Sequence, residues 1–240
     1  MRIYTNWEEA HEEVLRDLVE MGIQVKPKTM QDKVVAGNPD YETKELQNYC
    51  YTLLDAKSSE ITGVTQPWAT AEFSERVFDP YTRAHGYPVR LPEYINPGNA
   101  YKLRENVWDE FLHNGKFGYT YNELLWRNDQ VTKILNALYN DPDSRQLWIS
   151  LWSPDRDPDR LGGISRVPCS LGYGLQVREG KLNLHYVMRS CDFVTHFTND
   201  VYLAIKFLEW VAEKANYPVG NFTHTIFSLH IYKKDTKGVF

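Results

Sequence analysis

The stretch SLGYGLQVREGKLNLHYVMRSCD, residues 170–192, contains the pattern that decides the fold class. Two runs rich in apolar and aromatic residues flank Glu179 and Gly180, a pair that is typical of a tight turn. The stretch therefore predicts an antiparallel hairpin. QLWISLW (146–152) and FTHTIFSLHIY (222–232) have the same β-prone character and add strands to it.

Helical spacing of apolar residues marks several other segments. Residues 6–21 are expected to form a helix with Asn6 as N-cap and Gly22 as the stop signal. Further helices are expected at 40–57, 100–113, 122–140 and 199–216, strand and loop at 23–37, and a long proline-rich connection at 76–99. The sequence therefore predicts an α+β fold, with residues 1–240 as a single domain and one mixed, largely antiparallel sheet flanked by helices.

Composition excludes several classes of protein. Of the 240 residues, 42% are hydrophobic and 25% are charged, which is ordinary for a globular domain. The net charge of −5 gives no basic footprint, so nucleic acid is not an expected ligand. No apolar run approaches the ~20 residues that span a bilayer and no signal-peptide pattern is present, so a cytoplasmic protein without membrane contact is expected. The three cysteines lack a CxxC pair, so neither a disulfide scaffold nor a metal site is expected.

Chemically useful residues gather at the ends of the predicted hairpin. Cys169 directly precedes the first strand, and Arg189 and Ser190 lie near the end of the second, so a thiol and a guanidinium come onto neighbouring strand ends. A nearby cation lowers the pKa of a thiol and makes it a nucleophile, and an arginine beside a serine suits a phosphate. The alternative is that Cys169 is a small core residue.

Residues 40–232 resemble the thymidylate synthase superfamily. The resemblance is carried by NDPDSR (140–145), VPC (167–169), RSCD (189–192), FTND (197–200) and SLHIY (228–232), and upstream by YETKEL (41–46), VWDEF (107–111) and GYTY (118–121). Within that superfamily, the chain resembles the phage-type deoxycytidylate (dCMP) hydroxymethylases. Ser170, Met188 and Asp200 stand where thymidylate synthases carry histidine, glutamine and asparagine.

The exchange at Asp200 has a physical reason. Uracil presents a carbonyl at C4 and an N–H at N3, which one amide can pair. Cytosine presents an amino group at C4, and its N3 becomes protonated in the covalent intermediate, so two donors require two acceptors. The resemblance therefore implies dCMP as substrate, with Asp200 reading the base. The alternative is that Asp200 or Asn199 only caps the helix that follows.

The resemblance also implies a role for each other motif residue. Cys169 would attack C6 of the pyrimidine, and Glu45 would manage water and protons near the base, unless it is a solvated carboxylate on a helix face. The phosphate would be bound by Arg189, Ser190, Lys28 and, across a homodimer interface, Arg145. His230 and Tyr232 would bind the deoxyribose, unless they only pack in the sheet, and Tyr121 would lie beside the nucleophile. Trp108 and Asp192 would bind folate.

The implied activity is that of a deoxycytidylate 5-hydroxymethyltransferase in phage DNA modification. It would use 5,10-methylenetetrahydrofolate as co-substrate and add water to the transferred carbon. A dCMP C5-methylase, which transfers hydride instead of adding water, remains open. So does a nucleotide-binding homologue without folate activity, because Gln146 and His196 stand where the family often has arginine and glycine.

Overall fold

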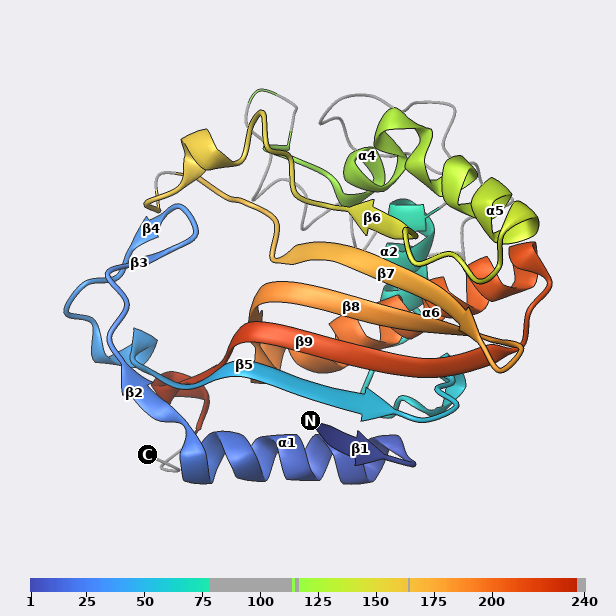
Figure 1. The fold of residues 1–240 in the computed structure, drawn as a ribbon. Coiled ribbons are helices and arrows are strands. Elements are labelled where there is room, and N and C mark those ends of the chain that lie inside the picture. Colours follow the sequence, from blue (N-terminus) through green and yellow to red (C-terminus); the bar gives the residue numbers. More distant parts are fainter. Residues whose placement is uncertain (78–113, 115–116, 164, 237–240) are drawn as a thin grey trace.

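The computed structural model describes residues 1–77, 114, 117–163 and 165–236. Their main sheet has the strand order β1-β5-β9-β8-β7-β6, and β2 also pairs with β5 (Figure 1). The strands are β1 (Arg2–Tyr4), β2 (Ile23–Val25), β5 (Thr43–Leu53), β6 (Trp148–Ser150), β7 (Ser170–Arg178), β8 (Lys181–Asp192) and β9 (Val219–Tyr232). Only the pairs β1–β5 and β8–β9 are parallel, so the predicted mixed, largely antiparallel sheet is confirmed.

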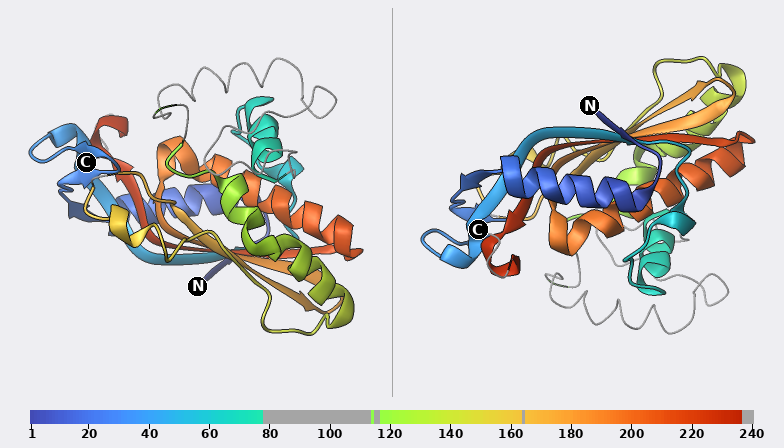
Figure 2. Two further views of the ribbon diagram at one scale, coloured as in Figure 1. Left: turned by 90° about the horizontal axis from the view of Figure 1, so that it is seen from above. Right: turned by 90° about the horizontal axis from the view of Figure 1, so that it is seen from below.

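Three helices, α1 (Trp7–Met21), α2 (Trp68–Val77) and α6 (Thr198–Ala215), lie on one side of this sheet (Figure 2). The helices α4 (Tyr121–Trp126) and α5 (Gln130–Asn140) lie near β6. Short elements complete the described chain: the hairpin β3 (Thr29–Met30) and β4 (Lys33–Val34), the turns η1 (Pro39–Tyr41), η2 (Ser58–Glu60), η3 (Arg127–Asp129), η4 (Pro158–Arg160) and η6 (Lys233–Asp235), and a π-helical turn, η5 (Phe193–Phe197). The helices among these residues are too short or too polar to cross a membrane.

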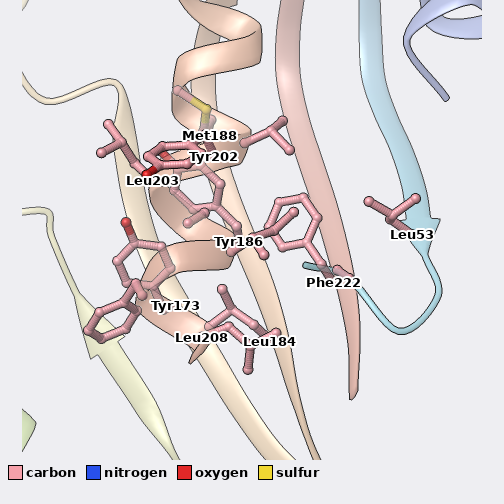
Figure 3. Close-up of a cluster of buried hydrophobic side chains, with 14 of the residues drawn as sticks. Leu53, Tyr173, Leu184, Tyr186, Met188, Tyr202, Leu203, Leu208 and Phe222 are labelled. Atoms are coloured by element: carbon pink, nitrogen blue, oxygen red, sulfur yellow. The ribbon is translucent and has the colours of Figure 1, made fainter. Parts of the chain in front are cut away.

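The core lies between the sheet and the helices. The side chain of Asn6 caps α1 by accepting a 2.8 Å hydrogen bond from the N–H of Glu9, as the sequence predicts. Side chains of β8 and β9, among them Tyr186 and Phe222, pack close to Leu203 and Leu208 of α6 (Figure 3). Burying a leucine or phenylalanine side chain contributes roughly 1.5–3 kcal/mol, so this contact anchors α6 and the residues at its start.

Three neighbouring strands change the face that they bury, and they do so at the same level of the sheet. In β9, Phe222, His224 and Ile226 are buried in alternation, and the next inward residues are Leu229 and Ile231. In β8 the same change falls between Met188 and Cys191, and in β5 between Leu46 and Tyr49, where Asn48 has a positive φ of 53°. Because side chains alternate along a strand, a shift of one residue moves the following set to the other face.

This change of face explains why the helix expected at residues 40–57 is wrong. The segment forms β5, a central strand paired with β9 over most of its length. Leu46 and Tyr49 face the core three residues apart because Asn48 interrupts the alternation, and this spacing imitates a helical period. The solvated helix-face alternative for Glu45 falls with the helix.

The helix expected at residues 122–140 is two helices. Asn128 and Asp129 both have positive φ values, 53° and 59°, which right-handed helices do not allow. They separate α4 from α5 and turn the chain between them. The helix expected at 100–113 lies outside the described residues, as does the expected connection after residue 77.

Candidate active site

Cys169 lies in the turn that enters β7 and is surrounded by three polar side chains. Its backbone N–H and that of Ser170 each donate a 3.3 Å hydrogen bond to the Tyr121 Oη. Its Sγ is 3.5 Å from Nη2 of Arg189 and 3.5 Å from Nε2 of Gln31. The thiol is half-buried, so a ligand can reach it while most of its environment is fixed by protein.

Arg189 is held rigidly beside this thiol. Its Nε donates to the carbonyl of Pro168 at 2.8 Å and its Nη2 to that of Val167 at 3.0 Å. Its backbone N–H also donates to the Cys169 carbonyl at 2.8 Å. The structure thus brings together the thiol and guanidinium that the hairpin predicts, and Arg189 in addition lines a surface hollow with Trp148, Ser150, Trp152 and Leu171.

The electrostatic balance at Cys169 differs from the expectation. Burial raises the pKa of the Cys169 thiol, the Arg189 guanidinium offsets part of that rise, and the Asp200 carboxylate adds to it. The sequence led us to expect a lowered pKa because it shows the cation but not the depth of burial. In the free protein the group is therefore a thiol, and its nucleophilic form requires loss of a proton during the reaction.

Gln31 is a site residue that the sequence did not suggest. It stands at the tip of the β3–β4 hairpin with a φ of 53°, and its Oε1 accepts a hydrogen bond from the Val167 N–H at 3.4 Å. Lys28 is exposed at the base of the same hairpin. No motif marks the MQDK turn, so only the folded hairpin shows that it reaches Cys169.

Asp200 lies in the first turn of α6 and does not cap it. The cap position is Phe197, without a side-chain cap hydrogen bond, and the Nδ2 of Asn199 instead donates to Oε2 of Glu72 at 2.8 Å. Burial raises the pKa of Asp200 to about 6, although the positive charges of Arg76 and His196 oppose the rise. Asp200 is therefore mostly a carboxylate at neutral pH and becomes a neutral acid just below it.

The partners of Asp200 on α2 also escaped the sequence analysis. Glu72 is buried, and its Oε1 forms an ion pair with Nη2 of Arg76 at 2.5 Å. The Arg76 guanidinium lies over the ring of Tyr121, 4.3 Å from its centroid. This group connects the base-reading candidate Asp200 to the tyrosine that holds the nucleophile turn. No sequence motif predicts it, because α2 carries none of the recognised motifs.

A second polar group forms where the strands have changed face. Glu45, His230 and Asp192 are paired side by side across β5, β9 and β8. The Ser228 Oγ donates to Oε2 of Glu45 at 2.6 Å, and the rings of His230 and Tyr232 are 5.1 Å apart. Burial lowers the pKa of His230, and burial raises that of Tyr232 to about 12, so both side chains are neutral hydrogen-bonding groups at neutral pH.

The remaining predicted residues fall in three places. Ser190 is half-buried and pairs with Ser228 in the sheet. The Oδ1 of Asp192 accepts from the N–H groups of Val194 and Thr195 at 3.1 and 3.3 Å, so this carboxylate caps the turn η5. Trp108 lies outside the described residues, and those residues contain no cluster of three or more metal-binding side chains.

Arg145 is exposed and lies far from the nucleophile of its own chain. It stands two residues before Leu147, whose carbonyl accepts from the N–H of Leu175. Leu175 is six residues along β7 from Cys169, and at about 3.3 Å per residue this places the Arg145 backbone roughly 20 Å from the thiol. An arginine side chain does not bridge that distance.

Comparisons with known proteins agree with this architecture. The family model described as thymidylate synthase matches residues 96–239. A putative thymidylate synthase from Methanosarcina barkeri is 28% identical over 229 residues, which cover 92% of this chain and 94% of that protein. The thermostable thymidylate synthase A from Bacillus subtilis has a similar fold, with a TM-score of 0.72 at 19% identity over 98% of this chain and 83% of the other.

Arg189→Gln tests the electrostatic account of the thiol. Removal of the cation raises the pKa of Cys169 further, so the rate of alkylation by iodoacetamide at neutral pH should fall severalfold. Peptide mass spectrometry measures the rate at each cysteine separately. Cys50, half-buried on another strand, is the internal control and should keep its rate. Equal or faster alkylation of Cys169 in the variant would contradict the account.

Proposed function

Because the chain belongs to the thymidylate synthase family, we propose that it is a dCMP hydroxymethylase. The family implies folate-dependent transfer of a one-carbon unit to a nucleotide, and the proposal adds the base and the product. It would convert dCMP, methylenetetrahydrofolate and water to 5-hydroxymethyl-dCMP and tetrahydrofolate. The observation that carries the proposal is the half-buried carboxylate of Asp200, which is close enough to Cys169 to influence the pKa of its thiol.

The described residues supply the chemistry on the pyrimidine. Cys169 loses its proton and bonds to C6, which makes C5 nucleophilic. The one-carbon unit of methylenetetrahydrofolate would join C5, and loss of the C5 proton would then break its C–N bond to the folate, which releases tetrahydrofolate and leaves an exocyclic methylene. The oxygen of water bonds to that methylene carbon and a water proton is released. The C6–S bond then breaks, which restores the C5–C6 double bond and the thiolate.

Asp200 supports cytosine over uracil as the base. In its ionised form it accepts two hydrogen bonds, one from the C4 amino group and one from protonated N3. Against uracil, the same carboxylate would face the C4 carbonyl without a proton between them. A buried polar group left unpaired in this way costs about 1–3 kcal/mol.

The product of the proposed reaction is the hydroxymethyl nucleotide rather than the methyl nucleotide. Water addition rests on the resemblance at Ser170, Met188 and Asp200, and a C5-methylase that uses hydride from the folate is the alternative. Ser170 is buried, and its hydroxyl hydrogen-bonds to that of Tyr186 beside the nucleophile turn. This buried pair fixes the start of β7 directly after the reacting thiol.

Two carboxyl groups, those of Glu45 and Glu72, are candidates for the residue that transfers protons at the base. Glu45 is grouped with Ser228 and His230, the candidate sugar-binding end of the site. Glu72 instead is close enough to Asp200 to raise the pKa of that carboxyl group, so its charge would lie near the edge of a base that Asp200 binds. We propose that Glu72 manages protons at the base and that Glu45 positions the group that binds the deoxyribose.

We also propose a homodimer with shared sites, which the position of Arg145 supports. Since Arg145 does not reach Cys169 of its own chain, a phosphate contact requires a second copy. The sheet face opposite α1, α2 and α6 offers a surface for that copy (Figure 2). Phe227 and Trp148, exposed by 46% and 47%, are apolar side chains on the sheet that a partner would cover.

Mass spectrometry of the product tests the proposed function. Incubation of dCMP with methylenetetrahydrofolate should give a product heavier than the methyl compound by one oxygen, and Cys169→Ser should give none. Asp200→Asn should lower the preference for dCMP over dUMP by about one to two orders of magnitude, because the amide pairs with uracil. A methyl product would establish the methylase alternative. Turnover of neither nucleotide would favour a binding protein without folate activity.

The two carboxyl roles are separated by Glu72→Gln and Glu45→Gln. Release of tritium from C5-labelled dCMP reports proton removal at the base and should fall by about 10²-fold or more in Glu72→Gln. Glu45→Gln should mainly raise the KM for dCMP and keep most of the release at saturation. The opposite pattern would assign proton transfer to Glu45.

Hybrid dimers test the shared site. Arg145→Ala and Cys169→Ala chains should each be nearly inactive alone. After they are mixed under conditions that exchange subunits, about a quarter of the wild-type activity should return, because half of the dimers are hybrids with one complete site. No recovery, with hybrids demonstrated by native mass spectrometry, would place Arg145 outside the site.

A further inference from the structure

We propose that Arg76 determines base specificity by holding Asp200 in its negatively charged form, so that the site accepts an aminopyrimidine and rejects its keto analogue. Arg76 acts through Asp200 and is a positioning residue rather than a catalytic one. The inference rests on the proposed function, since it requires that Asp200 reads the base. It adds a residue from α2, a helix outside the recognised motifs.

The guanidinium of Arg76 is fixed behind the site by contacts on two sides. Its side chain is only 19% exposed, and its Nη2 is paired with Glu72 on the same helix at 2.5 Å. Its planar group stacks over Tyr121 at 4.3 Å, the geometry of a cation–π contact. Glu72 in turn accepts the 2.8 Å hydrogen bond from Asn199, the neighbour of Asp200. Arg76 is thus connected to the start of α6 through Glu72 and Asn199, and to the turn at Cys169 through Tyr121.

Arg76 is a largely buried cation whose charge opposes the effect of burial on Asp200. Burial and Glu72 on α2 raise the pKa of Asp200, and the thiol of Cys191 on β8 lies 3.9 Å from its Oδ2. The phenols of Tyr121, Tyr173 and Tyr186, on α4, β7 and β8, carry no charge at neutral pH because burial raises the pKa of each. Among the described residues, Arg76 is the strongest influence that favours the carboxylate, and the exposed His196 one turn away and the hydrogen bond from the Cys191 thiol add to it.

Arg76 keeps its positive charge throughout the pH range of the experiment. Burial alone would lower the pKa of its guanidinium, but the charges of Glu72 and Asp200 raise it above its ordinary value. Arg76 therefore stays positive over the whole range in which Asp200 titrates. Its field is constant, and only the protonation of Asp200 changes with pH.

Protonation of Asp200 changes which base the site can pair. The carboxylate offers two acceptors, which match the amino group and the protonated N3 of cytosine. The neutral acid offers one O–H donor and one acceptor, which match the C4 carbonyl and the N3–H of uracil, as an amide would. The ionised fraction therefore serves dCMP and the neutral fraction serves dUMP. Loss of Arg76 would move Asp200 towards the neutral form and the enzyme towards dUMP.

The test is the ratio of kcat/KM for dCMP to that for dUMP between about pH 5.5 and pH 8. In the wild type the ratio should rise about tenfold per pH unit, since it follows the ratio of ionised to neutral Asp200. Arg76→Met should lower the ratio at every pH by roughly tenfold or more, because an uncompensated buried carboxyl binds its proton more tightly. Arg76→Lys, which keeps the charge, should restore most of it.

The ratio separates specificity from damage to the fold. A variant that is merely less stable loses both specificity constants together and keeps their ratio. In an Asp200→Asn background, Arg76→Met should leave the ratio unchanged, because no titrating group remains there. A wild type that prefers dCMP through Asp200, combined with an unchanged ratio in Arg76→Met, would overturn the role of Arg76 alone. A wild type that prefers dUMP at neutral pH would overturn the proposed function itself.

Discussion

The change of face shared by β5, β9 and β8 is the constraint on which the site depends. At one end of these strands, alternate side chains such as Phe222 and Tyr186 pack on α6. Past the change, Leu229 and Cys191 keep the core closed while His230, Ser228 and Glu45 come together on the other side. A regular sheet would offer one apolar and one polar face along its whole length. The shift lets the same strands build a core and then a polar site.

Burial of charge is the second physical theme of the site. Asp200 and Cys169 both lie where desolvation disfavours their ionised forms, and each is opposed by an arginine. Arg189 faces the thiol and Arg76 belongs to the group around Asp200. Because a partly compensated group titrates near neutral pH, Asp200 is poised to change its hydrogen-bonding pattern with small changes in its surroundings. Specificity for a base then becomes a matter of electrostatics as well as shape.

Much of the fold could be predicted from the sequence where one pattern acts alone. The 170–192 hairpin, the capped helix α1 and the long helix α6 follow from turn residues and apolar spacing. The strand β5 could not be predicted because the change of face at Asn48 disguises its period. The break between α4 and α5 at Asn128 and Asp129 was missed for a similar reason. The spacing of apolar residues does not show that these two residues have positive φ values.

The residues of the candidate site likewise divide into those that the sequence predicts and those that only the structure shows. Cys169, Arg189 and Asp200 were found because they lie in motifs whose order could be recognised. Gln31, Glu72 and Arg76 were not, since they reach the site only through tertiary packing of a hairpin and a helix without motifs. The depth of burial that raises the pKa of Cys169 is likewise a property of the fold alone.

The central claim is that the Asp200 carboxylate reads a cytosine presented to Cys169. A crystal structure of the protein with bound dCMP tests it most directly. The account predicts one Asp200 oxygen within hydrogen-bond distance of the C4 amino nitrogen, the other close to N3, and C6 beside the Cys169 Sγ. A base whose amino edge faces other residues, or a C6 turned away from Sγ, would contradict it.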